Sequence, residues 1–366
     1  MLTLDTLVPN LIQRGLFAPE SVLDGEVSVT AEHRRNHNLR VRRKDGPGLF
    51  VKQPGTGSSA AQTLQREGGF FVMCASEAGM APIHAYLPHL VLFDPETPVL
   101  GLELIEGAVP LWEHYGRTPG QVPSEAPRAL GTALGAAHRL LAPAARPGDP
   151  RGSWLPATPP WVLRLHRPAP ELRSSLSRAQ QRLLQILQTD TRLAAAFDAV
   201  GETWTPGTLV HGDIRSDNAL VVATKKGAVQ VRLIDWELVQ VGDPAWDVAG
   251  ALHDFLVFWT TTFPPAGTPE QRAGAAGVPL AAIQPAVRAF WGAYRNAWRG
   301  ADGAGVLERA VRFSAVRLIQ SAFEMSQTHA ALADTPILLL QLGANLLRDP
   351  RAGREHLYGL LPEETR

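Results

Sequence analysis

The sequence predicts an α+β fold with two lobes, a small antiparallel β-rich N-terminal lobe and a large, mainly helical C-terminal lobe. Short strand-like segments fill the first quarter of the chain, and helical periodicity dominates most of the remainder. With 366 residues and 45% hydrophobic residues, the chain can bury a sizeable core. We place the lobe boundary near residue 103, so that residues 1–103 form the N-lobe and residues 104–366 form the C-lobe.

In the N-lobe we expect short strands on both sides of one helix. The expected strands are Glu26–Val29, Asn38–Arg43, Gly48–Lys52, Val91–Phe93 and Val99–Ile105. A Lys-Asp-Gly-Pro turn at residues 44–47 joins the second and third strands, which indicates antiparallel pairing. The helix is expected over Gln62–Glu77, where apolar residues recur with helical spacing after a loop of Gly, Thr and Ser.

In the C-lobe, helical patterns surround a short strand-rich region. Helices are expected at Pro127–Leu141, at Ser175–Val200 and throughout the chain after Asp247, and strand-like runs at Leu209–Val210, Ala219–Ala223 and Val229–Asp235. The proline-rich stretch 142–170 reads as loop. It is either a surface connector or a lid that docks the substrate.

Charge and composition favour a small partner. Lys plus Arg equals Asp plus Glu at 35 each, so no overall field favours a nucleic acid or a membrane surface. A small molecule or a peptide is the expected substrate. Cys74 is the only cysteine, so an internal disulfide is excluded and the cytoplasm is the expected compartment. Residues 1–15 do not resemble a secretory leader, and the apolar run 337–340 is too short to span a bilayer.

Two carboxylates and an amide lie beside strand-like runs in the segments HGDIRSDN (residues 211–218) and IDWE (residues 234–237). Mg²⁺ prefers hard oxygen ligands, so Asn218 and Asp235 are candidate ligands near bound phosphates. A third polar group must orient the attacking hydroxyl or accept its proton. Asp213, five residues before Asn218, is the candidate for that role.

These two segments strongly resemble the aminoglycoside phosphotransferase and choline kinase-like group, distant relatives of protein kinases. The resemblance implies a two-lobed protein-kinase-like fold and an ATP-dependent phosphotransferase. It also implies that Asp213 is the catalytic base, that Asn218 and Asp235 bind Mg²⁺, and that His211 organises the loop. Arg215 occupies the position of the lysine in the protein-kinase catalytic loop. We therefore hypothesise that Arg215 stabilises charge on the transferring phosphoryl group.

Other residues of this region have two interpretations. Glu237 follows Asp235 by two residues. If the strand continues, Glu237 lies on the same face as Asp235 and assists the metal. The alternative is a solvated charge at the strand end. His211 is also explained as a core imidazole and Asp217 as a turn residue. Asp247 resembles the family's aspartate that caps the next helix and braces the catalytic loop, which gives it a structural role.

In the N-lobe, Lys52 resembles the strand lysine that reaches the nucleotide phosphates, and Glu67, on the predicted helix, is its expected partner. Glu103 and Ile105 lie in a segment that resembles the hinge contacting adenine. The segment Glu32–Asn38 lacks the glycines of a phosphate-covering loop. It is either a nucleotide contact through its amides and basic side chains or a plain basic hairpin.

The sequence gives less direct evidence about the phosphoryl acceptor. The stretch from Arg288 to Arg317 carries six arginines against Asp302 and Glu308, which argues against a cationic acceptor unless these arginines face solvent. The PPWVL segment at 159–163 resembles a subgroup that phosphorylates Ser or Thr of a precursor peptide before a partner lyase eliminates the phosphate. A further alternative is a catalytically silent pseudokinase that acts as a binding module, although the intact motifs oppose it.

Overall fold

The computed structural model describes residues 2–23, 25, 27–33, 37–44, 46–55, 58–170, 175–224, 227–300 and 302–361. It divides into two compact units. Unit 1 comprises Met1–Ala108 and Arg232–Val239, and unit 2 comprises Val109–Val231 and Gln240–Arg366. The segment that contains Asp235 therefore belongs to the same unit as the N-terminal strands.

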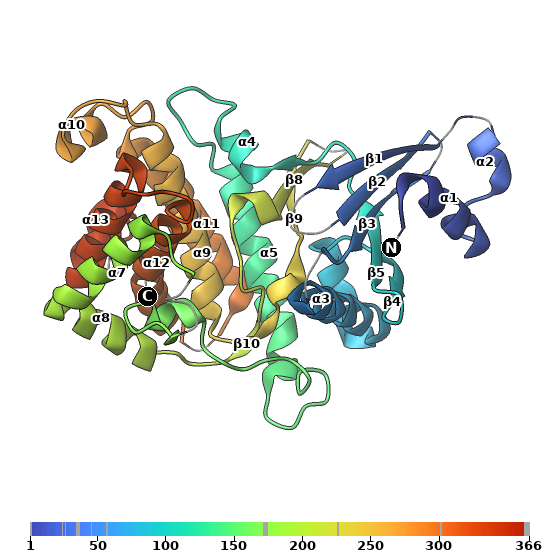
Figure 1. Ribbon diagram of the computed structural model, residues 1–366, viewed down its shortest axis with the longest axis horizontal. Coiled ribbons are helices and arrows are strands. Elements are labelled where there is room, and N and C mark those ends of the chain that lie inside the picture. The colour runs from blue at the N-terminus through green and yellow to red at the C-terminus, as the bar shows by residue number, and fades with distance from the viewer. Residues whose placement is uncertain are drawn as a thin grey trace. The chain divides into compact units, whose positions relative to one another are not determined.

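Unit 1 is built on an antiparallel sheet with the strand order β1-β2-β3-β5-β4 (Figure 1). Its elements are α1 (Leu4–Gln13), α2 (Pro19–Leu23), β1 (Val27–His33), β2 (His37–Arg43), β3 (Gly48–Gln53), α3 (Ser58–Ser76), the 3-10 helix η1 (Ala78–Ala85), β4 (Leu90–Asp94), β5 (Val99–Leu104) and the 3-10 turn η5 (Trp236–Leu238). Each of the five predicted strands is present, and β1 continues beyond its predicted end to His33.

The two faces of β3 pack against different helices. Val51 lies in an apolar cluster with Leu7 and Leu11 of α1. Lys52, the next residue, points to the opposite face because side chains alternate along a strand, and there it contacts Glu67 of α3. Helix α1 is not among the predicted elements, although Thr3 caps it and Leu7 and Leu11 show helical spacing.

Unit 2 is mainly helical and contains short strands around the polar motifs (Figure 1). Its strands are β6 (Val109–Pro110), β7 (Thr208–Val210), β8 (Ala219–Ala223), β10 (Gln240–Gly242) and the first residues of β9 (Val229–Leu233). Its α-helices are α4 (Leu111–Tyr115), α5 (Glu125–Leu141), α7 (Arg178–Thr189), α8 (Thr191–Glu202), α9 (Pro244–Thr261), α10 (Pro269–Gly274), α11 (Leu280–Trp298), α12 (Gly303–Met325), α13 (Asp334–Arg348) and α14 (Pro350–Ala352). Its 3-10 and π segments are η2 (Ala142–Ala145), η3 (Trp161–Arg164), η4 (Ser216–Asn218) and η6 (Gly353–Leu357).

Helices α5 and α11 pack closely because small residues face the contact. A Cβ atom on Gly131 would lie 2.1 Å from the carbonyl oxygen of Phe290, and one on Gly135 would lie 2.5 Å from that of Tyr294. Backbone therefore touches backbone at this crossing, which places the buried His138 of α5 beside Tyr294.

Two predicted elements differ from the structure in ways that affect the site. The helical pattern Ser175–Val200 is divided at Asp190, whose side chain accepts the backbone N–H groups of Arg192 and Leu193 and so begins α8. The strand predicted to reach Asp235 ends at Leu233. In the stretch 142–170 the structure has the short helices η2 and η3 between irregular segments.

Candidate active site

The HGDIRSDN motif forms the connection between β7 and β8 in unit 2. The backbone N–H of Asp213 donates to Nδ1 of His211 at 3.2 Å. The Nδ2 group of Asn218 donates to the backbone oxygen of Asp213 at 2.9 Å and approaches its Oδ2 at 3.3 Å. The side chain of Asp213 remains 30% exposed, so the motif holds this carboxylate in place while a ligand can still reach it.

A buried aspartate fixes the backbone of this loop. Asp247 accepts the backbone N–H of His211 at 2.6 Å and that of Gly212 at 2.9 Å, and Nε2 of His138 lies 3.0 Å from its Oδ2. The hydroxyl of Tyr294 bonds Nδ1 of His138 at 3.0 Å. Burial would raise the pKa of Asp247, but the hydrogen bond and charge of His138 outweigh it and lower that pKa. Asp247 therefore braces the loop as a carboxylate.

The helix cap and the loop brace are separate residues. Asp243, not Asp247, caps α9 by accepting the backbone N–H of Ala245 at 2.9 Å. Gly212 adopts a φ of +87°, a backbone conformation that favours glycine, and its oxygen accepts the indole N–H of Trp246 at 3.0 Å. The loop is thus held largely through its peptide groups.

A residue of α12 that the sequence motifs do not predict contacts Asp213. Nη2 of Arg317 lies 3.0 Å from Oδ1 of Asp213, the Arg317 side chain is 7% exposed, and its guanidinium lies 5.2 Å from the ring centroid of Trp246. A signal for this burial exists in the sequence, because Arg317 interrupts an apolar run that continues to Ile319. A cation in the middle of a buried stretch requires a partner.

Arg215 and its neighbours make further contacts in the same loop. Nη2 of Arg215 pairs with Oδ2 of Asp217 at 2.7 Å, and both side chains are more than a third exposed. Ser216 donates its hydroxyl to Asp254 at 3.1 Å. Burial raises the pKa of Asp254 to about 6, and the hydrogen bonds from Ser216 and the charge of Arg215 oppose that shift. Asp254 was not recognised from the sequence.

In unit 1, Lys52 is shared by two carboxylates. Its Nζ lies 2.8 and 2.9 Å from the oxygens of Glu67 and 2.6 Å from Oδ1 of Asp235. Lys52 is 5% exposed and Glu67 is fully buried. Burial would lower the pKa of Lys52, but the charges of Glu67 and Asp235 outweigh it and raise that pKa. The structure thus brings these three predicted residues together.

The backbone at Asp235 turns sharply, which corrects the placement of Glu237. Asp235 has φ 67° and ψ 57°, and Trp236 begins the 3-10 turn η5. The two acidic residues therefore do not share a strand face, because the strand has already ended at Leu233. The backbone N–H of Trp236 donates to Oε1 of Glu67 at 3.1 Å, and its ring stacks on Phe70 with centroids 4.3 Å apart. Glu237 lies near Arg66. Burial lowers the pKa of Arg66, and the charge of Glu237 opposes that shift.

The predicted hinge residues lie at the end of β5. The backbone N–H of Glu103 donates to the oxygen of His89 at 2.9 Å, and its Oε2 accepts the His89 N–H at 3.2 Å. The amide of Glu103 is therefore already used within unit 1, while Ile105 follows the strand and is half-buried. Within the predicted phosphate segment, residues 34–36 lie outside the described part of the chain.

A model of the phosphotransferase enzyme family matches residues 30–301, well over half of the chain. The chain belongs to this family. The match includes Lys52, Glu67, Asp213, Asn218 and Asp235. The resemblance seen in the two motifs is thereby confirmed, and the chain is a phosphotransferase enzyme. No curated protein matches the sequence.

Solved structures share the fold of this phosphotransferase at low sequence identity. An ethanolamine kinase from Plasmodium vivax has 12% identity and a TM-score of 0.56, with 94% of this chain and 90% of that chain covered. A choline kinase from Cryptosporidium parvum Iowa II has 11% identity and a TM-score of 0.56, with coverage of 97% and 98%. The GDP complex of aminoglycoside 2'-phosphotransferase-IIIa has 15% identity and a TM-score of 0.55, with coverage of 94% and 99%. The predicted kinase-like fold is confirmed.

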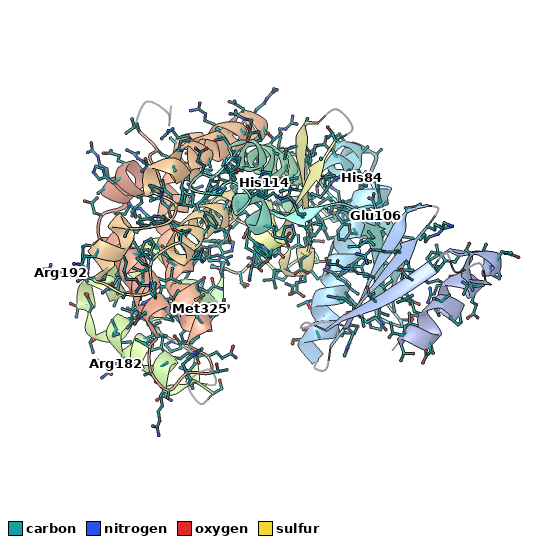
Figure 2. All side chains as sticks on the ribbon, turned by 90° about the horizontal axis from the view of Figure 1, so that it is seen from above. His84, Glu106, His114, Arg182, Arg192 and Met325 are labelled. Carbon is teal, nitrogen blue, oxygen red and sulfur yellow. The ribbon has the colours of Figure 1, made fainter. Side chains whose placement is uncertain are left out.

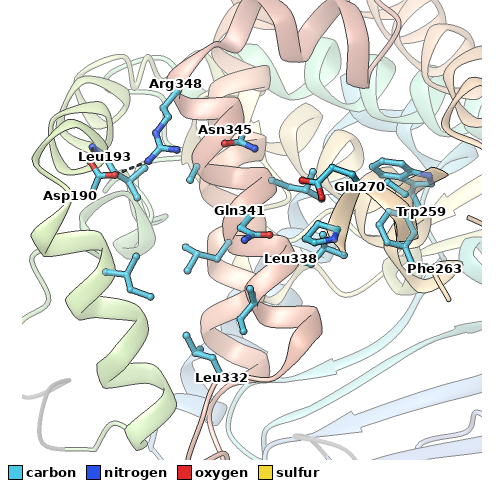
Figure 3. A pocket seen from close by; sticks show the side chains of 17 residues that line it. Asp190, Leu193, Trp259, Phe263, Glu270, Leu332, Leu338, Gln341, Asn345 and Arg348 are labelled. Carbon is cyan, nitrogen blue, oxygen red and sulfur yellow. Dashed lines mark hydrogen bonds and ion pairs between the residues drawn. The ribbon is translucent and has the colours of Figure 1, made fainter. Parts of the chain in front are cut away.

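A pocket of about 720 Å³ also lies in unit 2 of the phosphotransferase (Figure 3). Trp259 and Phe263 line it from one side, and Gln341 of α13 also lines it. Asp190 pairs with Arg348 at 2.7 Å along its edge. Among the described residues that line it, none comes from the HGDIRSDN loop. The pocket is therefore separate from the carboxylate of Asp213.

Within the described ranges, no group of three or more His, Cys, Asp or Glu side chains is arranged to hold a metal ion. No helix in the described part of the chain is both long and apolar enough to cross a membrane.

Proposed function

We propose that this phosphotransferase moves the γ-phosphoryl group of ATP to a hydroxyl group of a small molecule in the presence of Mg²⁺. Family membership supports the transfer reaction. The names of the ethanolamine kinase, the choline kinase and the aminoglycoside phosphotransferase favour a small hydroxyl compound over a peptide. Unit 1 serves the nucleotide through Lys52, and unit 2 serves the acceptor through Asp213.

The shared lysine in unit 1 carries the proposal. One lysine faces two carboxylates there, with Nζ of Lys52 2.8 Å from Glu67 and 2.6 Å from Asp235. A metal ion that also touches ligand phosphates needs a carboxylate that solvent can reach. Glu67 is fully buried, whereas the Asp235 side chain is 36% exposed. Asp235 is accordingly the carboxylate that binds a cation, while Glu67 orients Lys52 toward phosphate oxygens.

Mg²⁺ fits the oxygen donors that the chain offers. Asp235 supplies a carboxylate, and Asn218 supplies an amide oxygen because its Nδ2 is already used by Asp213. When bound, Mg²⁺ neutralises charge on the phosphate oxygens. With the strand argument for Glu237 removed, we limit the proposed ligands to these two residues.

Asp213 receives the proton in the proposed reaction. The acceptor oxygen forms a bond to the γ-phosphorus, the bond from that phosphorus to the bridging oxygen breaks, and ADP leaves. The hydroxyl proton passes to the carboxylate of Asp213, whose position is held by Asn218 and Arg317. Arg215 stands two residues away and pairs with Asp217, so its charge supports the transferring group only after that exposed pair rearranges.

Mass-spectrometric detection of phosphorylated product tests this proposal. Purified protein is incubated with Mg²⁺ and either ATP or GTP, because one structural neighbour was solved with GDP. The acceptors are aminoglycosides, ethanolamine, choline, simple polyols and Ser/Thr-rich peptides. Asp213→Asn is the matched variant, since it keeps the shape of the side chain and removes the base.

Product formed by the native protein and lost in Asp213→Asn supports the proposal. Product on a small molecule selects the reaction proposed here, whereas product only on a peptide replaces it with peptide phosphorylation. Magnesium-dependent nucleotide binding without transfer to any acceptor overturns it in favour of a binding module.

A further inference from the structure

The contact between Arg317 and Asp213 bears on the acceptor. Nη2 of Arg317 reaches Oδ1 of Asp213 at 3.0 Å, while Asn218 approaches the other carboxylate oxygen at 3.3 Å. The two oxygens thus have different partners, which fixes the plane of the carboxylate. Arg317 is 7% exposed, so its charge is poorly screened by water.

Two arginines pair with carboxylates of the catalytic loop. Arg317 balances Asp213, and Arg215 balances Asp217. Burial, together with the charge of Arg317, lowers the pKa of the buried His253 imidazole to about 3. Asp254, which accepts the Ser216 hydroxyl, adds a further carboxylate to this loop, but the charge in direct contact with the base is the cation of Arg317, which repels an ammonium group.

The aromatic ring next to the base is also occupied. Trp246 is the kind of side chain whose face binds ammonium ions, but the guanidinium of Arg317 already lies over its ring at 5.2 Å. An ammonium group brought to this ring would replace a buried guanidinium that also pairs with Asp213. Arg317 thus removes both an anionic and an aromatic contact for a cation.

Polar side chains continue from Arg317 along α12. Nη1 of Arg317 lies 3.4 Å from Oε1 of Gln320, and Nε2 of Gln320 donates to Glu324 at 2.8 Å. Met325, labelled in Figure 2, ends the helix and is 46% exposed. The exposed carboxylate of Glu324 lies seven residues beyond Arg317, or about 10 Å along the helix, so it does not alter the charge next to the base.

We propose that Arg317 sets the charge class of the acceptor, so that the group beside the reacting hydroxyl is uncharged or anionic and not an ammonium. This inference rests on the proposed function, in which Asp213 receives the hydroxyl proton. Arg317 acts as a positioning residue for Asp213 and as a specificity-determining residue toward the acceptor. It distinguishes the chain from a kinase of ethanolamine or choline, since both compounds carry a cation close to their hydroxyl group.

Matched probes separate charge preference from general activity. Ethanolamine, ethylene glycol and glycolate present a hydroxyl next to a cation, a neutral group and an anion, and the same set is made from any acceptor found in the wider screen. We expect the kcat/KM of the native protein for the cationic probe to be at least about tenfold below that for the neutral one. Arg317→Gln should bring the two values together and lower kcat for every probe by up to about a hundredfold, because the base is no longer held.

Two further variants show whether the effect belongs to the charge at this position. Arg317→Lys keeps the charge and loses the planar fork, so it should retain the preference against the cation while kcat falls. Arg312→Gln removes a cation from the same helix that pairs with Glu308 at 3.1 Å, and it should behave like the native protein. Urea unfolding of each variant confirms that it is folded before kinetics are compared.

The outcomes distinguish the two proposals. A native protein that prefers the ammonium probe, or an Arg317→Gln protein with unchanged preference, overturns the role of Arg317 and leaves phosphoryl transfer intact. If the native protein phosphorylates none of the compounds and matches Asp213→Asn throughout, phosphoryl transfer itself is wrong and this inference is overturned with it.

Discussion

The ammonium group of Lys52 lies 2.6 Å from the carboxylate of Asp235, a residue 183 positions later in the chain. The same ammonium contacts both oxygens of Glu67. A strand, a helix and a short returning segment therefore meet at one buried cation within unit 1. Much of the stability of this unit should depend on the balance among these three charges.

Replacing Lys52 alone with Met should destabilise unit 1 more than replacing both Lys52 and Glu67. The single variant leaves Glu67 buried without its cation, which is expected to lower the free energy of unfolding by about 3–5 kcal/mol. The double variant Lys52→Met with Glu67→Met should recover part of that loss, because no unpaired charge is left behind. Urea unfolding of both variants measures this, and equal losses would contradict the ion-pair interpretation.

Replacing Asp247 with Asn should loosen the loop that carries Asp213. The amide offers one acceptor oxygen where the carboxylate serves His138 and the backbone N–H groups of His211 and Gly212. Hydrogen bonds to charged groups contribute about 1.5–3 kcal/mol each, so a loss of about that size in unfolding free energy is expected. Turnover should fall as well. Asp302→Asn, at a side chain that is 66% exposed and pairs with Arg309, is the control and should cost at most about 1 kcal/mol without a change in turnover.

Helix α9 touches the catalytic loop at a glycine, which allows a test of loop position. A Cβ atom on Gly250 would lie 2.4 Å from the backbone oxygen of Ile214, so Gly250→Ala must displace the loop or the helix. We expect a loss of about 1–3 kcal/mol in unfolding free energy together with reduced turnover. Gly292→Ala in α11 is the matched control, because nothing lies within 4 Å of that position. The control should be neutral or more stable, since alanine favours a helix.

The burial of Asp254 should appear in the pH dependence of stability. Its pKa is raised from 3.8 to about 6, so the folded protein holds a proton that the unfolded chain releases. The stabilising contribution is full below about pH 4 and is lost as the pH rises through about 6, by about 3 kcal/mol in all.

Asp254→Asn tests this directly, because the amide does not titrate. Relative to the native protein, the variant should gain unfolding free energy between pH 4 and pH 8, measured by urea denaturation across that range. A difference between the two proteins that stays constant with pH would show that Asp254 is ionised throughout. Arg215, Asp217 and Ser216 surround this carboxylate and remain unchanged in the experiment.

The local parts of the site could be read from the sequence. The spacing within HGDIRSDN and IDWE depends on neighbouring residues, so the sequence predicts Asp213, Asn218 and Asp235 as a group, whereas the prediction of Lys52 and Glu67 rests on a resemblance to the strand lysine of kinases and its helical partner. The predicted limits of the strands are close to the observed ones because they also depend on neighbouring residues. The missed α1 has a cap and two well-spaced leucines, but it is short and precedes a strand-rich region that dominated the interpretation.

Packing between distant segments decided the remainder. The sequence does not distinguish among the arginines between residues 288 and 317. The guanidinium of Arg317 contacts Asp213, which lies 104 positions earlier in the chain, because α12 packs beside the catalytic loop. Arg309 pairs with Asp243 and Asp302, and Arg312 pairs with Glu308. Likewise, the turn at Asp235 separated Glu237 from its expected face. Local spacing specifies residue types and short elements, whereas the partner of a buried charge depends on which helices pack together, and that is a property of the folded chain.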